Sequence, residues 1–251
     1  MTKPAIFDAI AFQYDENRGG EERGQRFAAS FAPLLKRDER VLEVGVGTGV
    51  VASALEAQGF NVIGVDVSRE MLKRAISRVR QVVWADMNTL PFVENSFGSV
   101  YAVWALHLAQ NIPEMLHEIR RILIEGGAFL NCSAANRNLV PINDRAEEIM
   151  LGVHAALSGE ELTVDSPRQL EGYAEAAGFA FERVVDISHD YETTPSKIAL
   201  HLERRGMSVL QRATPEQVRD IIEPALAELK SLPEQVLRRR RMHQIAVLRA
   251  V

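Results

Sequence analysis

Residues 41–50 read VLEVGVGTGV, and this stretch decides the fold. A short apolar run leads into a loop in which Gly45, Gly47 and Gly49 alternate with other residues. Such a sequence is typical of a buried strand that turns sharply into a helix, because glycine lets the backbone turn tightly and approach a ligand closely. The loop predicts contact with a bound ligand, although a tight turn without a ligand needs the same residues.

The order of these glycines separates two kinds of nucleotide site. The dinucleotide pattern GxGxxG would need its third glycine at position 50, where this chain has Val50. Glu43, inside the strand, would repel a pyrophosphate but would attract the cationic aminopropyl end of S-adenosylmethionine. The segment therefore favours the sulfonium cofactor over NAD.

Two aspartates end the next two predicted strands. Asp66 closes the apolar segment NVIGVD, where its carboxylate suits both hydroxyls of a ribose. Asp86 closes QVVWAD, where it suits an adenine amino group while the backbone N–H of Met87 serves a ring nitrogen. Each aspartate alone also fits a helix cap or a turn. Their place at successive strand ends favours one nucleoside site.

Strand-like and helix-like apolar patterns alternate from residue 40 to residue 132, which predicts βαβ units and a parallel sheet. We expect the third and fourth strands, QVVWAD and FGSVYAVWALHL, to lie in the interior of that sheet. After residue 133 the alternation loosens. The later segments predict helices over 143–157 and 167–177, a strand over 181–187, a helical insertion over 196–237 and a last strand over 243–250.

Composition narrows the classes of protein. The 251 residues are 47% hydrophobic and carry a net charge of -5, which disfavours stable nucleic-acid binding. The run Arg238–Arg241 is interpreted as a solvated helix end, with a patch for an anionic partner as the alternative. Cys132 is the only cysteine, which fits a reducing cytoplasm and no thiolate metal site. We expect neither a signal peptide nor a membrane span.

Four stretches together resemble the class I S-adenosylmethionine-dependent methyltransferases, particularly the branch acting on small molecules and quinone precursors. The resemblance covers residues 40–133 and departs from the family at Gly98, where aspartate is usual, and at Glu125, where proline is usual. The stretches that carry it are VLEVGVGTG (41–49), GVDVSREMLKRA (64–75), ADMNTLPFVENSF (85–97) and EIRRILIEGGAFL (118–130).

The resemblance implies a fold, a cofactor and a set of site residues. The fold is a Rossmann-like, doubly wound α/β sheet of seven mostly parallel strands with an antiparallel last strand. The implied domain is single and spans 1–251, with a helical cap (1–37), a cofactor-binding core (38–133), a helical cover (134–165 and 190–240) and the end of the sheet (166–189 and 241–251). The implied cofactor contacts are Glu43, Gly45, Val46, Gly47 and Gly49 for the methionine part, Asp66 for the ribose, and Val67, Asp86 and Met87 for the adenine. Tyr14 of the N-terminal FDAIAFQYD segment would fold over the cofactor or, alternatively, anchor its helix.

Methyl transfer requires an aligned acceptor and no protein nucleophile. If the acceptor must lose a proton, His107 at the end of the fourth strand is the candidate general base. No histidine grouping predicts a metal ion. The sequence therefore predicts a methyltransferase that acts on a small molecule and releases S-adenosylhomocysteine, as a monomer or homodimer. An RNA or protein methyltransferase, a non-catalytic cofactor-binding protein and an NAD-linked oxidoreductase stay open as alternatives.

Overall fold

The computed structural model describes residues 7–8, 10–133, 137–138, 144–158, 164–205 and 208–251. The chain divides into two compact units. Unit 1 comprises residues 1–135, 163–187 and 243–251, and unit 2 comprises residues 136–162 and 188–242. The second unit takes in most of the segments predicted as a helical cover, and a single domain stays a prediction.

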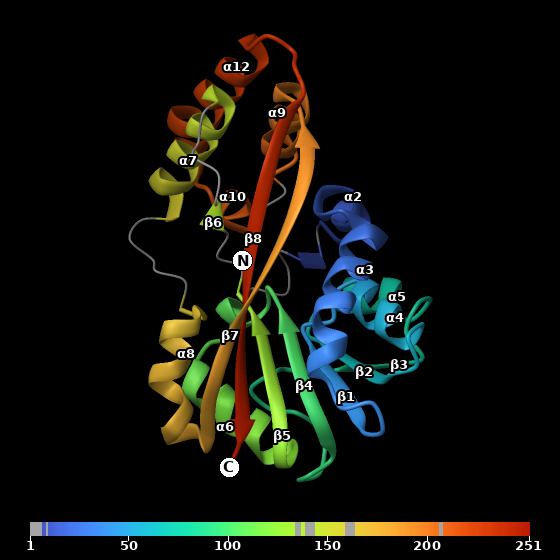
Figure 1. The fold of residues 1–251 in the computed structure, drawn as a ribbon. Helices are drawn as coiled ribbons and strands as arrows, with labels where there is room; N and C mark the ends of the chain where they lie inside the picture. Colours follow the sequence, from blue (N-terminus) through green and yellow to red (C-terminus); the bar gives the residue numbers. More distant parts are fainter. Residues whose placement is uncertain (1–6, 9, 134–136, 139–143, 159–163, 206–207) are drawn as a thin grey trace. The chain divides into compact units, whose positions relative to one another are not determined.

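Strands of the described residues form one mixed sheet in the order β3-β2-β1-β4-β5-β8-β6, with β7 paired to β8 (Figure 1). The first five strands are parallel and β8 is antiparallel to β5, so the predicted Rossmann-like arrangement is confirmed. The strands are β1 (Arg40–Val44), β2 (Asn61–Asp66), β3 (Gln81–Trp84), β4 (Phe97–Val103), β5 (Leu123–Cys132), β6 (Arg137–Asn138), β7 (Phe179–Thr193) and β8 (Leu237–Ala250).

Helices connect and follow these strands. In unit 1 they are α2 (Tyr14–Arg18), α3 (Gly20–Phe31), α4 (Val50–Glu56), α5 (Arg69–Ala75), the short 3₁₀ helix η3 (Leu106–Leu108), α6 (Ile112–Ile122) and α8 (Pro167–Ala174). In unit 2 they are α7 (Arg145–Ser158), α9 (Pro195–Glu203), α10 (Ser208–Gln211), α11 (Pro215–Gln217) and α12 (Glu223–Ser231). None of the described helices combines the length and the apolarity that crossing a bilayer requires.

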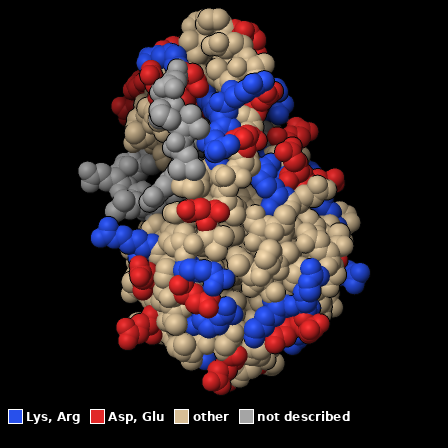
Figure 2. All heavy atoms as spheres, in the orientation of Figure 1, with Lys and Arg blue, Asp and Glu red and all other residues tan. Residues whose placement is uncertain are grey.

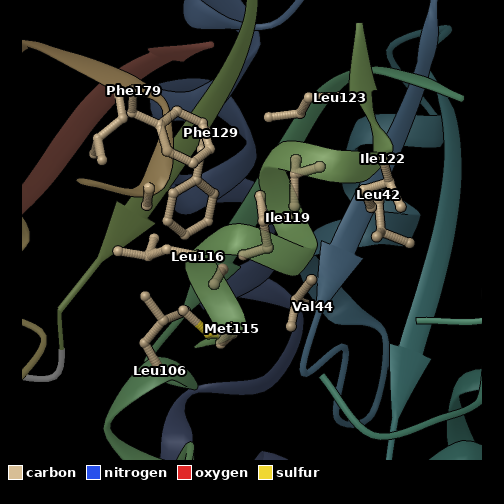
Figure 3. Close-up of a cluster of buried hydrophobic side chains, with 14 of the residues drawn as sticks. Leu42, Val44, Leu106, Met115, Leu116, Ile119, Ile122, Leu123, Phe129 and Phe179 are labelled. Atoms are coloured by element: carbon tan, nitrogen blue, oxygen red, sulfur yellow. The ribbon is translucent and has the colours of Figure 1, made fainter. Parts of the chain in front are cut away.

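The sheet of unit 1 separates two buried apolar layers. Leu42 and Val44 of β1 pack with α6 and α8 on one face, whereas Val41 packs with α3 and α4 on the other. Figure 3 shows the first layer, in which side chains of α6 lie between β1 and Phe129. Because successive strand residues point to opposite faces, Glu43 lies on the same side as Val41. This alternation places the Glu43 side chain on the face of the sheet that α3 and α4 cover.

The third strand is not in the interior, so that prediction was wrong. β3 pairs only with β2 and forms the edge of the sheet, and Trp84 is 57% exposed. The run QVVWAD is apolar enough for a buried strand, but its place depends on which strands follow. β4, by contrast, lies between β1 and β5 and is buried from Phe97 to Ala102, as predicted.

The interpretation of Arg238–Arg241 as a helix end was also wrong, because these residues belong to β8. On one side Arg238 pairs with Glu192 at 3.0 Å and Arg240 pairs with Asp190 at 2.6 Å, both on β7. On the other side Arg239 pairs with Asp144 at 2.6 Å. The visible face in Figure 2 mixes positive and negative side chains in the same way. The arginines are therefore paired with carboxylates on both sides of β8.

Unit 2 has its own apolar core. Residues from α7, α9, α10 and α12 bury Val153, Leu202, Leu210 and Leu229 against one another. The predicted helical insertion is thus present, but the flanking strands are longer than predicted: β7 has 15 residues where seven were predicted, and β8 has 14 where eight were predicted. Charged side chains extend both strands beyond the segments that apolar periodicity marks.

Candidate functional site

A cavity of about 550 Å³ lies within unit 1 at the carboxyl ends of β1, β2 and β4. Parallel α/β sheets bind ligands at this edge, where loops leave the strand ends. Its walls come from the glycine loop (Gly45, Gly47), the end of β2 (Val65, Asp66, Val67), Met71, residues 85–88 after β3, residues 103–105 and 108–110 after β4, and Phe7 and Tyr14 of the N-terminal segment.

The glycine loop is shaped by backbone angles that favour glycine. Gly45, Gly47 and Gly49 have φ values of 72°, 54° and 80°. A Cβ on Gly45 would lie 2.5 Å from the Cβ of Ala105, whereas one on Gly47 would meet nothing within 4 Å. Gly45 therefore permits close packing against the segment after β4, and Gly47 is bare where it faces the cavity. A ligand approaches the Gly47 backbone without obstruction.

Asp66 is held in place by the loop it faces. Its Oδ2 accepts the backbone N–H of Gly47 and its Oδ1 accepts that of Ser68, both at 2.8 Å. Burial raises the pKa of Asp66, and these hydrogen bonds oppose that rise. Because each carboxylate oxygen accepts more than one hydrogen bond, both oxygens stay able to receive ligand hydroxyls. The aspartate is thus oriented before any ligand arrives.

Asp86 and Met87 lie on the opposite wall. The Oδ1 of Asp86 accepts hydrogen bonds from the backbone and the side chain of Asn88, at 2.8 and 2.7 Å. Asp86 therefore stabilises a turn, the alternative that the sequence left open, and it also lines the cavity. Asp86 can do both, because a turn at the end of β3 lies at the same edge of the sheet as the cavity.

Glu43 lies beneath the loop and does not line the cavity. It is 2% exposed, and its Oε2 accepts the hydroxyl of Tyr101 at 2.8 Å. Burial raises the pKa of Glu43 to about 8, against the opposing effects of the Tyr101 hydrogen bond, Arg23 and the backbone of Ala52. Among the other predicted contacts, Val46 and Gly49 also lie outside the cavity lining.

Two aspartates that the sequence analysis missed fasten the N-terminal segment to residues beside the cavity. Asp8 accepts the Ser68 hydroxyl at 2.5 Å, and Asp15 accepts the Thr48 hydroxyl at 2.5 Å. Asp15 also pairs with Arg78 at 2.7 Å. Tyr14 lines the cavity beside these anchors, so both of its predicted roles fit its position.

Trp104 forms part of the wall where β4 ends. Its φ is 54°, a conformation that costs free energy in a bulky residue, and the guanidinium of Arg23 lies 5.5 Å from its ring centroid. The same guanidinium lies 5.4 Å from the Tyr14 ring centroid. An aromatic and cationic group therefore borders the cavity.

His107 lies in η3, between wall residues 103–105 and 108–110, but is not itself in the lining. Its Nδ1 lies 4.0 Å from the Oδ2 of Asp165, a fully buried carboxylate just before α8. Asp165 was not predicted, because no sequence signal links residues 58 positions apart.

Comparison with known proteins now adds to this geometry. A family model described as a methyltransferase domain matches residues 42–131. Over this segment the chain is similar to the class I S-adenosylmethionine-dependent methyltransferases. The matched region holds the glycine loop, Asp66, Asp86 and His107, and it ends at the last residues of β5.

Curated relatives align with about half of the chain. The chain is 34% identical over 145 residues to the demethylmenaquinone methyltransferase of Symbiobacterium thermophilum, an alignment covering 52% of this chain and 58% of that protein. It is 32% identical to the malonyl-[acyl-carrier protein] O-methyltransferase of Halorhodospira halophila, covering 49% of this chain and 45% of that protein. The alignments thus cover only about half of the length of these relatives.

Solved structures share the fold over most of the chain. The [4+2]-cyclase SpnF superposes with a TM-score of 0.64 at 18% identity, covering 98% of this chain and 94% of that one. Phosphoethanolamine N-methyltransferase 2 of Haemonchus contortus, solved with S-adenosylhomocysteine, gives a TM-score of 0.56 at 20% identity, covering 97% and 58%. At such identities the likeness establishes the fold alone.

Proposed function

We propose that this chain binds S-adenosylmethionine in the cavity of unit 1 and transfers its methyl group to a small-molecule acceptor. The observation that carries the proposal is the convergence of Gly47, Asp66 and Asp86 on one cavity. These residues come from three successive strand ends and meet at about 550 Å³ of space, within the usual range for small-molecule sites.

The residues present fit this cofactor. Asp66 would accept the two ribose hydroxyls, and Asp86 with the backbone N–H of Met87 would bind the adenine edge beside Val67. Gly45, Gly47 and Gly49, with Val46 between them, would bring the backbone to the methionine part. Tyr14 would cover it from the N-terminal segment.

Glu43 would act on the cofactor from below the loop. With a pKa of about 8 it holds a proton at neutral pH, and a cation bound above the loop would favour its ionised form. Its predicted attraction to the methionine part would then act through the loop and not by direct contact.

The bound cofactor supplies an activated methyl group, so the protein's work is to align the acceptor and exclude water. We propose a small acceptor of the quinone-precursor kind, which the demethylmenaquinone methyltransferases among the relatives support. A cytoplasmic location is part of the proposal, supported by the buried thiol of Cys132. The RNA or protein methyltransferase and the cofactor-binding protein without catalysis are the second candidates, and SpnF shows the same fold in a protein named as a cyclase.

Calorimetric titration tests the cofactor. We expect S-adenosylmethionine and S-adenosylhomocysteine to bind and NAD to give no heat. Asp66→Asn should weaken S-adenosylhomocysteine binding roughly 10- to 100-fold, because it removes charge-assisted hydrogen bonds to the ribose. Asp186→Asn, at an exposed position on β7, is the matched control and should bind like the wild type. Binding of NAD alone contradicts the proposal, and an unchanged affinity of Asp66→Asn removes this residue from the ribose site.

A further inference from the structure

Asp165 is a buried carboxylate with two differently placed oxygens. Its Oδ1 accepts the hydroxyl of Ser133 at 3.2 Å, and its backbone carbonyl accepts the side chain of Asn131 at 3.0 Å. Its Oδ2 lies 4.0 Å from Nδ1 of His107. Asn131 lies near the end of β5 and Ser133 directly follows the strand, so the end of β5 fixes the carboxylate that faces the imidazole.

The imidazole is accessible, whereas its carboxylate partner is not. The His107 side chain is 21% exposed and that of Asp165 is 0% exposed. His107 follows Ala105 by two residues and precedes Leu108, and both of these residues line the cavity. A carboxylate that is closed to solvent and an imidazole that is open to it are the components of an oriented general base.

We propose that Asp165 holds His107 as the general base of the methyl transfer, and that the acceptor is a phenol or an enol, whose acidic hydroxyl loses its proton as its oxygen attacks. The inference rests on the proposed function and specifies its substrate class. An acceptor carboxylate has no proton to give up before it attacks, so it would not need this pair. Asp165 is a positioning residue that acts through His107.

The step balances as follows. The acceptor O–H bond breaks and Nε2 of His107 takes the proton, while the acceptor oxygen forms a bond to the methyl carbon. The methyl–sulfur bond breaks and its electron pair stays on sulfur, which gives neutral S-adenosylhomocysteine. The positive charge of the sulfonium ends on the imidazolium, where the nearby Asp165 carboxylate stabilises it.

Among the described residues, Cys132 of β5 is a further ionisable group that interacts with Asp165. Burial raises the pKa of its thiol so far that it stays neutral. Burial also raises the pKa of Asp165, while hydrogen bonds from Ser133, from Asn131 and from the backbone of His107 oppose the rise. The pH response of the cluster is therefore that of the coupled His107–Asp165 pair.

A spectroscopic test does not need the natural acceptor. Imidazole nitrogens are followed by nitrogen-15 NMR across pH in the S-adenosylhomocysteine complex, with His107→Gln used to assign the His107 signals. We expect neutral His107 to carry its proton on Nδ1, and Asp165→Asn to move its titration to lower pH and to mix the two tautomers. An identical titration and tautomer in Asp165→Asn overturns the proposal.

A kinetic test uses radiolabelled S-adenosylmethionine with two groups of probe acceptors. Catechol and 2-hydroxy-1,4-naphthoquinone carry acidic hydroxyls, whereas ethanolamine and malonate do not. We expect labelling of the hydroxyl probes at a rate that rises with pH. His107→Gln should lower kcat about 100-fold and Asp165→Asn about 10-fold, without change in S-adenosylhomocysteine affinity. His189→Gln, on β7, should match the wild type.

The outcomes separate the two proposals. A wild-type protein that does not bind S-adenosylhomocysteine contradicts the proposed function itself. Labelling of ethanolamine or malonate alone, or an unchanged kcat in His107→Gln, overturns only the base and its substrate class. If the wild-type protein binds the cofactor but labels none of the four probes, the NMR titration decides whether Asp165 positions His107. An unchanged titration and tautomer in Asp165→Asn then overturns the proposal.

Discussion

The surroundings of the cavity in unit 1 and the strand pair β7–β8 use charge in opposite ways. Asp66 lines the cavity and Glu43 is buried near it, and burial raises the pKa of each. On the strand pair, Arg240 and Asp190 are exposed and simply pair with each other across the strands. Buried carboxyls with raised pKa values are costly to maintain and cluster at functional sites, whereas exposed pairs contribute little and carry no such implication.

The difference also shows that a run of like charges in a sequence is a poor guide to a binding site. Four consecutive arginines suggest a patch for an anionic partner, yet on β8 at least three of them pair with carboxylates of described residues. Glu43 is a single carboxyl in an apolar run, and its burial makes it physically far more unusual than these arginines.

The largest effect is expected when a methyl group is added to the glycine loop where it packs against Ala105. Gly45→Ala should lower the free energy of unfolding by about 3 kcal/mol, because its Cβ would collide with Ala105 and its φ is positive. Gly47→Ala is the matched control, with positive φ but open space, and should cost about 1 kcal/mol. Urea denaturation without cofactor measures both. Equal losses would show that backbone strain alone, and not contact with Ala105, determines the loop.

The second prediction concerns the pH dependence of stability. The ordinary pKa of a glutamate is 4.5, whereas that of folded Glu43 is about 8, so between these values the unfolded chain releases a proton that the folded chain keeps. The contribution of this group is therefore complete below pH 4.5 and is lost as the pH rises through 8.

The free energy of unfolding of the wild type relative to Glu43→Gln should thus fall by about 3 kcal/mol between pH 5 and pH 8. Denaturation of both proteins at several pH values measures this difference. The exposed Glu171→Gln is the control and should track the wild type. A constant difference between wild type and Glu43→Gln would mean that Glu43 is ionised in the folded protein.

The smallest effects are expected on β8, where two neighbouring arginines sharpen the comparison. The side chain of Arg239 is 12% exposed and pairs with Asp144 and Glu147, whereas that of Arg240 is 52% exposed. Arg239→Gln should lower the free energy of unfolding by about 1 kcal/mol after screening by solvent. Arg240→Gln should leave the urea midpoint unchanged. A larger effect at Arg240 than at Arg239 would refute the view that burial determines the contribution of these pairs.

Local sequence predicted the positions of the glycine loop, Asp66 and Asp86 well, because the turns and strand ends that carry them are local. The turn after β1 requires glycines at positions 45, 47 and 49, and Asp66 directly follows a buried apolar run. Parallel strands place their carboxyl ends at one edge, so a prediction of strands and turns was enough to bring Asp66 and Asp86 to the same cavity. The pattern did not reveal that Glu43 points away from that edge.

Sequence reasoning failed where partners are distant along the chain. β3 is at the edge because of strand order, which no local pattern contains. In the charged ends of β7 and β8, Asp190 and Glu192 lie across from Arg240 and Arg238, about fifty residues later. Apolar periodicity marks only strands that bury a face, so it missed strand ends whose paired side chains are charged and exposed.

The sequence by itself determined the Rossmann-like core, the sulfonium cofactor that we propose and the strand ends that would hold it, since strand, turn and strand-end residues are encoded within a few positions. Only the tertiary structure decided that Glu43 is buried against Tyr101, that Asp8 and Asp15 fasten the N-terminal segment, and that Asp165 faces His107. These contacts join residues 33 to 60 positions apart, and packing, which acts between surfaces and not between neighbours in the chain, brings them together.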